Sequence, residues 1–366
     1  MSFSAADHEF MARALQLARR GLNTTTPNPR VGCVIVKNGA VIGEGWHEKA
    51  GEPHAEINAL ASIVGATDGA TAYVTLEPCS HHGRTPPCVD ALIAVGVGRV
   101  VAAMQDPNPQ VAGNGMARLA AAGIDTVAGL METEARELNI GFISRMTRGR
   151  PWLRLKVAAS LDGKTALNNG KSQWITGPDA RRDAHAWRAR SCAMLTGIGT
   201  VRDDNPRLTV RDVAAGMTIV RQPLRVVVDS RLEISFDAAI LEGGNTLIAC
   251  AVADDAKAAQ LRARGADVVV LPNASGKVDL PALLTELGRR GINEVMAEAG
   301  ARLNASLLRE GCVDELLIYQ APLLLGDKAR GMFDLAELTD MANAKHLSIV
   351  ERHVVGADFF LRARIS

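Results

Sequence analysis

Four residues in the first quarter of the chain have the types and spacing of a metal-dependent hydrolytic site. His54-Ala-Glu56 stands at the start of a predicted helix. Pro78-Cys79 lies at a predicted strand-to-helix junction and is followed by Cys88. One imidazole and two thiolates form the ligand set of a catalytic zinc whose fourth position is open to water. Zinc lowers the pKa of that water toward neutrality, so that hydroxide becomes available as the nucleophile. Glu56 is placed to take the proton of the water and pass it to a leaving amine.

The order of these residues matches the zinc nucleobase-deaminase signature H-x-E…P-C-x-x-C, except that eight residues separate the two cysteines. A structural zinc is the alternative interpretation, with His81 or His82 as the fourth ligand. Such a closed site would leave Glu56 without a role. The remaining cysteines are expected to be apolar core residues: Cys33, Cys192, Cys250 and Cys312.

Longer segments surround these residues: Thr26-Pro-Asn-Pro-Arg-Val-Gly-Cys33, Gly51-Glu-Pro-His-Ala-Glu56, Thr75–Cys88 and Gln105-Asp-Pro-Asn-Pro-Gln-Val-Ala-Gly113. They closely resemble the bacterial bifunctional deaminase–reductase family of riboflavin biosynthesis. In that family the gap between the two cysteines is also long and is filled by His-His-Gly-Arg-Thr-Pro-Pro, so the departure from Cys-x-x-Cys supports the resemblance.

The resemblance implies a substrate, 2,5-diamino-6-ribosylamino-4(3H)-pyrimidinone 5′-phosphate, whose ring 2-amino group is hydrolysed to a carbonyl. It also implies contacts to the polar groups of that substrate from Asn28, His81, His82 and Arg84. For Asn28 the alternative is a turn residue between two prolines. For the other three residues it is a solvated loop.

Two segments of the second half end a predicted strand and begin a possible binding loop. They are Gly197–Arg211 and Glu298-Ala-Gly-Ala-Arg-Leu-Asn-Ala-Ser306. A helix that begins at Gly300 would let backbone N–H groups approach a diphosphate closely. No G-x-G-x-x-G motif lies in a βαβ unit, so an ordinary dinucleotide fingerprint is absent. By themselves these segments indicate little more than a second α/β domain.

Together with Lys156–Gly163 and Ser172-Gln-Trp-Ile-Thr176, these segments resemble the reductase half of the same family. The resemblance implies a dihydrofolate-reductase-like fold that uses NADPH to reduce the ribosyl group of 5-amino-6-(5-phosphoribosylamino)uracil to ribityl, with hydride delivered to C1′. The cofactor contacts that it implies are Ala158, Trp174, Thr200, Asp204, Ser230, Gly300, Ala301, Arg302, Leu303, Asn304, Ala305 and Ser306. The substrate contacts are Ser172, Arg188, Leu208, Arg211 and Glu298.

Physical chemistry supports part of this set. Arg188 and Arg211 suit a phosphate clamp, because a guanidinium pairs bidentately with phosphate oxygens. Lys156 and Asp204 are candidates for protonating or polarising the sugar oxygen, although a structural ion pair is an equally good interpretation.

The elements that must position these residues alternate along the chain. In the first half, apolar spacing and turn residues predict helices at 7–20, 54–64, 89–94, 115–122 and 132–145, and strands at 31–36, 41–45, 72–76, 99–104 and 125–128. In the second half they predict helices at 178–190, 254–264, 280–290 and 301–310, and strands at 152–158, 193–195, 225–228, 246–249, 268–271, 294–297 and 315–319. The segments 345–353 and 358–365 are predicted to form an antiparallel edge hairpin.

The pattern predicts two α/β domains, with a boundary in the basic segment Arg145–Pro151, which contains the helix breakers Gly149 and Pro151. With the resemblance, residues 1–146 are expected to form a cytidine-deaminase-like α/β/α sandwich that binds one zinc ion. Residues 147–366 are expected to form the NADPH-dependent, dihydrofolate-reductase-like domain.

Composition restricts the partners. The 366 residues carry 41 Lys plus Arg against 40 Asp plus Glu, and 4% are aromatic. Such a chain is poorly suited to bind nucleic acid or an anionic membrane. No stretch approaches the ~18 apolar residues of a membrane span. The N-terminus lacks the apolar region of a signal peptide. We expect a cytoplasmic enzyme with a small-molecule substrate, and the resemblance suggests a homodimer.

Two other functions fit parts of the sequence. One is a deaminase of cytosine or adenosine in nucleic acid, against which the near-zero net charge argues. The other is a nucleotide-sensing protein that has lost turnover, against which the presence of His54, Glu56, Cys79 and Cys88 argues. Replacing Glu56 with Gln distinguishes an enzyme from a sensor, because only the enzyme has deamination to lose.

Overall fold

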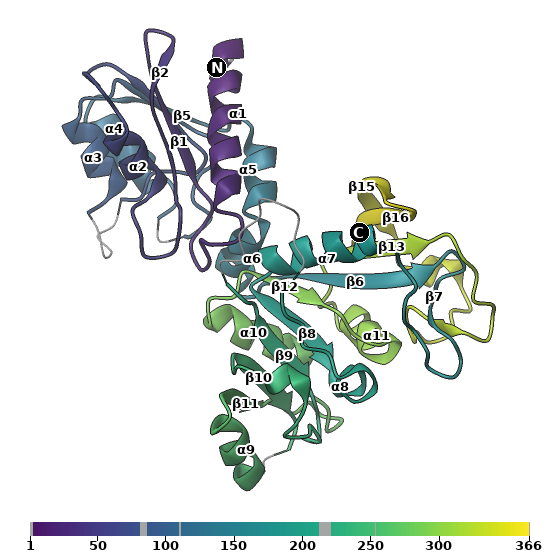
Figure 1. The fold of residues 1–366 in the computed structure, drawn as a ribbon. Helices are drawn as coiled ribbons and strands as arrows, with labels where there is room; N and C mark the ends of the chain where they lie inside the picture. The colour runs from purple at the N-terminus through teal and green to yellow at the C-terminus, as the bar shows by residue number, and fades with distance from the viewer. Residues whose placement is uncertain (1–2, 81–85, 110, 212–220, 253, 366) are drawn as a thin grey trace. The chain divides into compact units, whose positions relative to one another are not determined.

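The computed structural model describes residues 3–80, 86–109, 111–211, 221–252 and 254–365. The chain divides into two compact units, Met1–Gly149 and Arg150–Ser366, each built around its own central sheet (Figure 1). In the part of the chain that is described, no helix is both long enough and apolar enough to cross a membrane.

The first unit contains a five-stranded mixed sheet in the order β2-β1-β3-β4-β5. Strand β1 pairs antiparallel with both β2 and β3, whereas β3, β4 and β5 are parallel. Asn38 and Gly39, both at positive φ, form the tight turn between β1 and β2, which confirms the predicted hairpin. The strands are β1 (Gly32–Lys37), β2 (Ala40–Trp46), β3 (Thr71–Val74), β4 (Arg99–Ala102) and β5 (Asp125–Ala128).

Helices cover both faces of this sheet, as Figure 1 shows, and alternate residues of β1 divide between the two resulting cores. Val34 and Val36 face α1 and α5, whereas Cys33 and Ile35 face α2, α3 and α4. Helix α2 approaches β2 so closely that a Cβ on Gly45 would lie 2.3 Å from the backbone nitrogen of Ala59. The helices are α1 (Ala5–Arg20), α2 (Ala55–Ala61), α3 (Cys88–Ala94), α4 (Asn114–Ala121), α5 (Glu132–Leu138) and α6 (Ile140–Arg148).

The helix predicted over 132–145 is two helices, because Asn139 interrupts it. The buried Asn139 amide accepts the Arg30 N–H at 2.8 Å and donates to the Arg30 carbonyl at 2.9 Å. The second piece, α6, continues past the predicted boundary at 146/147 to Arg148 and ends at Gly149, which has a φ of 69°. The helix predicted over 54–64 is also shorter and ends at Ala61.

The second unit contains a nine-stranded sheet in the order β11-β10-β9-β8-β12-β6-β13-β16-β15. The strands from β11 to β13 are parallel, and β16 and β15 add an antiparallel hairpin at one edge, as predicted. These strands are β6 (Trp152–Ser160), β8 (Ala193–Gly197), β9 (Leu224–Val228), β10 (Thr246–Cys250), β11 (Ala266–Val270), β12 (Glu294–Ala297), β13 (Glu315–Ala321), β15 (Leu347–Val355) and β16 (Asp358–Ile365). The short strands β7 (Lys164–Ala166) and β14 (Arg330–Gly331), which were not predicted, pair with each other.

Helices cover both faces of this sheet as well. Leucines of α10 and α11 pack on one face, and Ala184 of α7 and Leu261 of α9 pack on the other. The predicted α/β class is therefore confirmed in both units. The helices are α7 (Pro178–Arg190), α8 (Ile198–Asp204), α9 (Asp255–Arg262), α10 (Leu280–Arg289) and α11 (Ala301–Arg309), with 3₁₀ turns η1 (Ala239–Leu241) and η2 (Met341–Asn343). Helix α8 was not predicted.

Candidate active sites

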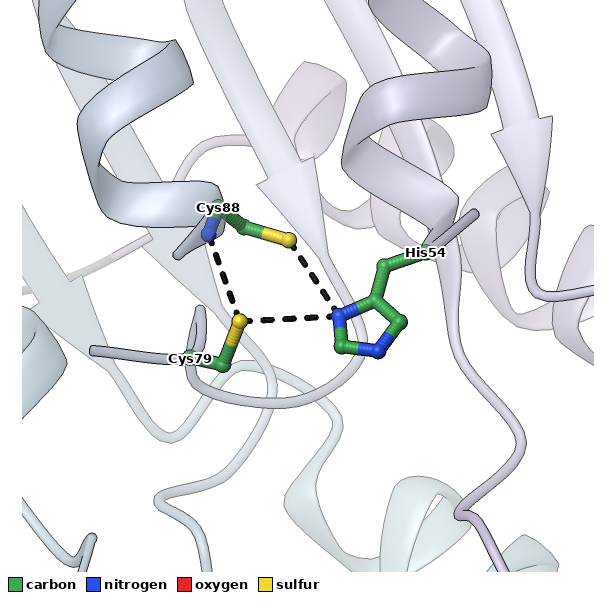
Figure 2. Close-up of side chains that lie close together, drawn as sticks. All are labelled: His54, Cys79 and Cys88. Atoms are coloured by element: carbon green, nitrogen blue, oxygen red, sulfur yellow. Dashed lines mark hydrogen bonds between the residues drawn. The ribbon is translucent and has the colours of Figure 1, made fainter. Parts of the chain in front are cut away.

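Three predicted metal ligands meet in the first unit although they come from separate segments. His54 is the N-cap residue of α2, Cys79 follows β3, and Cys88 is the first residue of α3. Their ligand atoms all lie within 4.8 Å of one another. Figure 2 shows the Nδ1 atom of His54 facing both sulfur atoms, 3.5 Å from Cys79 Sγ and 3.4 Å from Cys88 Sγ.

This arrangement fits zinc. Two ligands placed on a tetrahedral zinc at the usual Zn–N and Zn–S distances lie about 3.5 Å apart, which is the separation between the imidazole and each thiol. Among the described residues the group has three members, which is the number of protein ligands in a catalytic zinc site. His81 and His82, the predicted fourth ligands of the alternative structural site, lie outside the described residues.

The charges of the group favour metal binding by a thiolate. A hydrogen bond with Cys88 and another with His54 lower the pKa of the Cys79 thiol. The backbone N–H of Cys88 also donates to Cys79 Sγ at 3.2 Å. The hydrogen bond with Cys79 in turn raises the pKa of His54 against the effect of burial.

Glu56 lies in the first turn of α2 and is only 4% exposed. Burial raises the pKa of its carboxyl to about 7, and the neighbouring Cys79 adds to the shift. A carboxyl with a pKa near the working pH can both accept and release a proton, which is what general acid–base catalysis requires.

A buried histidine that the sequence did not point out connects Asn28 to this group. The ring of His47 is 5.4 Å from that of His54, edge to face. Burial lowers the pKa of His47. The neutral ring donates from Nδ1 to the Pro53 carbonyl at 3.0 Å, so its Nε2 accepts from the Asn28 amide, also at 3.0 Å. Asn28 is thus held beside the metal group. Arg84, predicted with His81 and His82 to contact the substrate, lies outside the described residues.

In the second unit, three predicted residues form one charged cluster. Arg188 of α7 makes a bidentate ion pair with Glu298, which follows β12, at 2.6 and 2.9 Å. The ammonium of Lys156, on β6, lies 3.7 Å from the same carboxylate. The side chains are only 13–16% exposed.

The two cations determine the ionisation of this cluster. Burial alone would raise the pKa of Glu298, but Arg188 and Lys156 outweigh it and lower the value to about 2. Burial lowers the pKa of Lys156 and Arg188 lowers it further, and together they outweigh Glu298, which raises it. A lysine with a lowered pKa is a better proton donor near neutral pH.

Arg188 is less suited to the predicted phosphate clamp than Arg211. Glu298 already accepts hydrogen bonds from two nitrogens of the Arg188 guanidinium, whereas the side chain of Arg211 is exposed.

Several predicted cofactor residues follow the carboxyl ends of parallel strands, where ligands of open α/β sheets bind. Thr200 lies in α8, after β8, and Gly300 is the N-cap of α11, after β12. A Cβ on Gly300 would lie 3.9 Å from the Thr200 hydroxyl, so the two turns adjoin. Ser230 follows β9, and its hydroxyl accepts the Val278 N–H.

The other predicted residues differ in exposure. Arg302 and Asp204 are exposed, and Trp174 is 69% exposed with the Arg181 guanidinium 4.6 Å above its ring. Asn304, Ala305 and Leu208 are buried, and so a ligand would meet their backbone. Half-buried residues complete the set: Ala158, Ser172, Ala301, Leu303 and Ser306.

Comparison with known proteins identifies both units. Residues 4–104 match the family described as the cytidine and deoxycytidylate deaminase zinc-binding region, and residues 151–359 match the RibD C-terminal domain. The chain is 50% identical over 364 residues to riboflavin biosynthesis protein RibD of Escherichia coli strain K12, covering 97% of this chain and 98% of the relative. The chain belongs to the RibD family. It is 46% identical to the Haemophilus influenzae RibD, with 99% and 98% of the two chains covered.

Solved RibD structures have the same fold over the whole length. The Acinetobacter baumannii RibD superposes with a TM-score of 0.92 at 43% identity, and the Thermotoga maritima deaminase/reductase with 0.86 at 33% identity; each comparison covers 99% of both chains. As a RibD family member, the chain is a bifunctional enzyme of riboflavin biosynthesis, a zinc-dependent deaminase and an NADPH-dependent reductase.

Proposed function

We propose that the chain first hydrolyses the 2-amino group of 2,5-diamino-6-ribosylamino-4(3H)-pyrimidinone 5′-phosphate. It then reduces the ribosyl group of the product, 5-amino-6-(5-phosphoribosylamino)uracil, to ribityl. The observation that carries the first step is the meeting of His54, Cys79 and Cys88 beside the buried Glu56. The similarity to the Thermotoga maritima protein, a diaminohydroxyphosphoribosylaminopyrimidine deaminase and 5-amino-6-(5-phosphoribosylamino)uracil reductase, supports the choice of substrates.

In the deaminase step, His54, Cys79 and Cys88 would hold the metal. Zinc, when bound, supplies a Lewis acid that brings the pKa of a water close to neutrality. Glu56 takes a proton from the attacking water and delivers it to the departing amine, for which its pKa of about 7 is suited. Asn28, oriented by His47, contacts the polar edge of the ring. His81, His82 and Arg84, which precede Cys88 in the sequence, are proposed to contact the substrate.

In the reductase step, NADPH, when bound, would supply the hydride that reduces C1′. We propose that Thr200, Ser230 and the turn at Gly300 bind the cofactor at the carboxyl ends of the parallel strands, together with Ala158, Trp174, Asp204 and residues 301–306. Glu298 and Lys156 face the sugar, and Lys156 protonates or polarises its oxygen. Arg188 orients Glu298, and Arg211 binds the phosphate with support from Ser172 and Leu208.

The two activities divide between the two halves of the chain. We assign the deaminase, predicted for 1–146, to the unit that ends at Gly149, and the reductase, predicted for 147–366, to the unit that begins at Arg150. The two family matches at 4–104 and 151–359 support this division. We place the enzyme in the cytoplasm, where its six free cysteines would stay reduced. We also propose a homodimer that pairs along β15, an edge strand with eight exposed residues out of nine.

Mass spectrometry of the diaminopyrimidine substrate, incubated with zinc-loaded protein, tests both steps. Replacing an amine with a carbonyl oxygen adds about 1 Da, and hydride plus a proton adds about 2 Da more. The proposal requires the first mass shift whether or not NADPH is added. It requires the second mass shift only when NADPH is present. The first shift alone would remove the reductase assignment. The absence of any shift would contradict the substrate and favour the sensor or nucleic-acid interpretation.

A further inference from the structure

Helix α4 is capped by a residue from a distant segment. Its own N-cap position is occupied by Gly113, which has no side chain. The carboxylate of Glu77 performs this role instead. One oxygen accepts the N–H groups of Gly115 and Met116 at 2.8 and 3.3 Å, and the other accepts those of Asp106 and Gly113 at 3.1 and 2.9 Å. Glu77 is 3% exposed, and its negative charge suits the positive end of the helix dipole.

This cap is attached to a proposed metal ligand. Glu77 precedes Cys79 by two residues, and the same end of α4 touches the peptide between them. A Cβ on Gly115 would lie 2.1 Å from the Pro78 carbonyl oxygen. The backbone of α4 therefore packs directly against the segment that carries Cys79.

One turn further along α4, Arg118 contacts both cysteine segments. Its guanidinium donates to the carbonyl of Ser80, the residue after Cys79, at 2.8 Å. It also pairs with Asp90, in the first turn of α3 two residues after Cys88, at 2.6 Å. Helix α4 thus holds Cys79 from both sides and holds the helix that presents Cys88.

The contacts from α4 can set the distance between the two cysteine sulfur atoms. Where two cysteine ligands stand two residues apart, a single turn of backbone sets the distance between their sulfur atoms. Here eight residues intervene, so the distance depends on tertiary contacts. Figure 2 shows that Cys79 comes from a loop and Cys88 from the start of a helix.

We propose that Glu77, with Arg118, is a positioning residue for the thiolate pair. By fixing the Cys79 segment against α4, it sets the geometry and the affinity of the metal site. This inference rests on the proposed ligation of zinc by His54, Cys79 and Cys88. Contacts of this kind around metal ligands are worth roughly 10- to 100-fold in metal affinity or activity.

Cobalt-substituted full-length protein provides the test, because Co²⁺ bound to thiolates has charge-transfer and d–d absorption bands that report ligand geometry. The carboxylate of Glu77 accepts hydrogen bonds from backbone N–H groups. In Glu77→Gln the amide NH₂, itself a donor, faces some of these N–H groups. We expect Co²⁺ and Zn²⁺ affinity, measured by competition with a chromophoric chelator, to fall roughly 10- to 100-fold. We also expect shifted d–d bands, and a loss in kcat of deamination with little change in KM. Arg118→Met should change the metal affinity and the d–d bands in the same direction as Glu77→Gln, but by a smaller amount.

Glu44→Gln is the matched control, since it removes a carboxylate of the same unit that pairs with Arg13 and does not touch α4. It should leave both metal readouts unchanged. Absence of thiolate-to-cobalt bands in the unmodified protein would refute the ligand assignment itself. Normal bands and affinity in both Glu77→Gln and Arg118→Met would overturn the positioning role, even if melting temperatures fall. If Glu77→Gln does not fold, Arg118→Met decides, because this side chain is 43% exposed.

Discussion

At the residue scale, Glu56 combines burial with a neighbouring thiol, and both raise its pKa to about 7. Glu56→Gln keeps the shape and removes the proton acceptor. We therefore expect deamination to slow by roughly 10²- to 10⁴-fold. The zinc content should stay the same, because the three ligands remain. The measurement is the rate of the first mass shift, with metal content determined in parallel.

The exposed Glu52, four residues earlier in the chain, offers a control for this substitution. Glu52→Gln should deaminate at the normal rate. Reduction of added 5-amino-6-(5-phosphoribosylamino)uracil should be normal in both variants, because that site lies in the other unit. Deamination by Glu56→Gln within a few-fold of the normal rate would disprove the proposed proton transfer.

The cluster around Glu298 gives a second prediction at this scale. In Glu298→Gln, Arg188 and Lys156 lose the carboxylate that compensates their charges, and a buried pair that loses one partner typically costs about 3–5 kcal/mol. We expect reductase activity to fall at least ~100-fold with deamination preserved, and the second unit to melt at a lower temperature. Separate assays of the two activities on the same sample measure this, and equal losses of both would contradict it.

At the element scale, helix α1 depends on one buried carboxylate. Ser4 and Asp7 form a capping box, and Asp7 also accepts hydrogen bonds from Tyr73 at 2.7 Å and Arg99 at 2.8 Å. Although burial opposes them, these bonds hold the pKa of Asp7 well below its usual 3.8. The ionised group therefore stabilises the fold above that value, and the contribution is lost as the pH falls toward the folded pKa.

The resulting prediction concerns Asp7→Asn. At neutral pH it should lower the free energy of opening of α1 and β3 by about 2–3 kcal/mol, as hydrogen exchange of their amides would measure. The difference from the unmodified protein should shrink below about pH 4. Asp125→Asn removes the exposed partner of Arg99 and should have little effect. A difference that stays constant at acidic pH would contradict the assignment to Asp7.

At the scale of the whole molecule, strand β15 is an edge strand of the nine-stranded sheet, and no other strand of the described residues pairs with its outer side. Ile349, Val354 and, on the neighbouring β16, Phe359 are 59%, 61% and 51% exposed. Exposed apolar edges favour pairing with another chain, and a second copy offers the same edge in antiparallel orientation.

Sedimentation at micromolar concentration tests the dimer. Ile349→Lys combined with Val354→Lys should convert it to a monomer, because both substitutions place charges on the pairing edge. Val64→Lys, at a 95% exposed apolar residue of the other unit, is the control and should not change the mass. A monomeric unmodified protein, or a dimer that survives the double substitution, would exclude pairing through β15.

Local sequence was enough to predict elements with clear boundaries. The Pro178–Arg190 helix begins with a proline in its first turn and matches α7, and the strands at 125–128 and 294–297 match β5 and β12. Helix α8 was missed because it is short and polar. The break between α5 and α6 was missed because its cause, Arg30, lies 109 residues before Asn139.

The sequence by itself determined the types, order and spacing of the ligand residues, because the metal ligands and the proton-transfer group lie in short sequence motifs. Only the tertiary structure decided which groups surround them. Glu77 caps α4, and Lys156 meets Arg188 at Glu298, because β6 and β8 both flank β12 in the sheet. Apolar periodicity shows which face of a strand is buried but not which strand lies beside it, so contacts between distant segments appear only when the chain has folded.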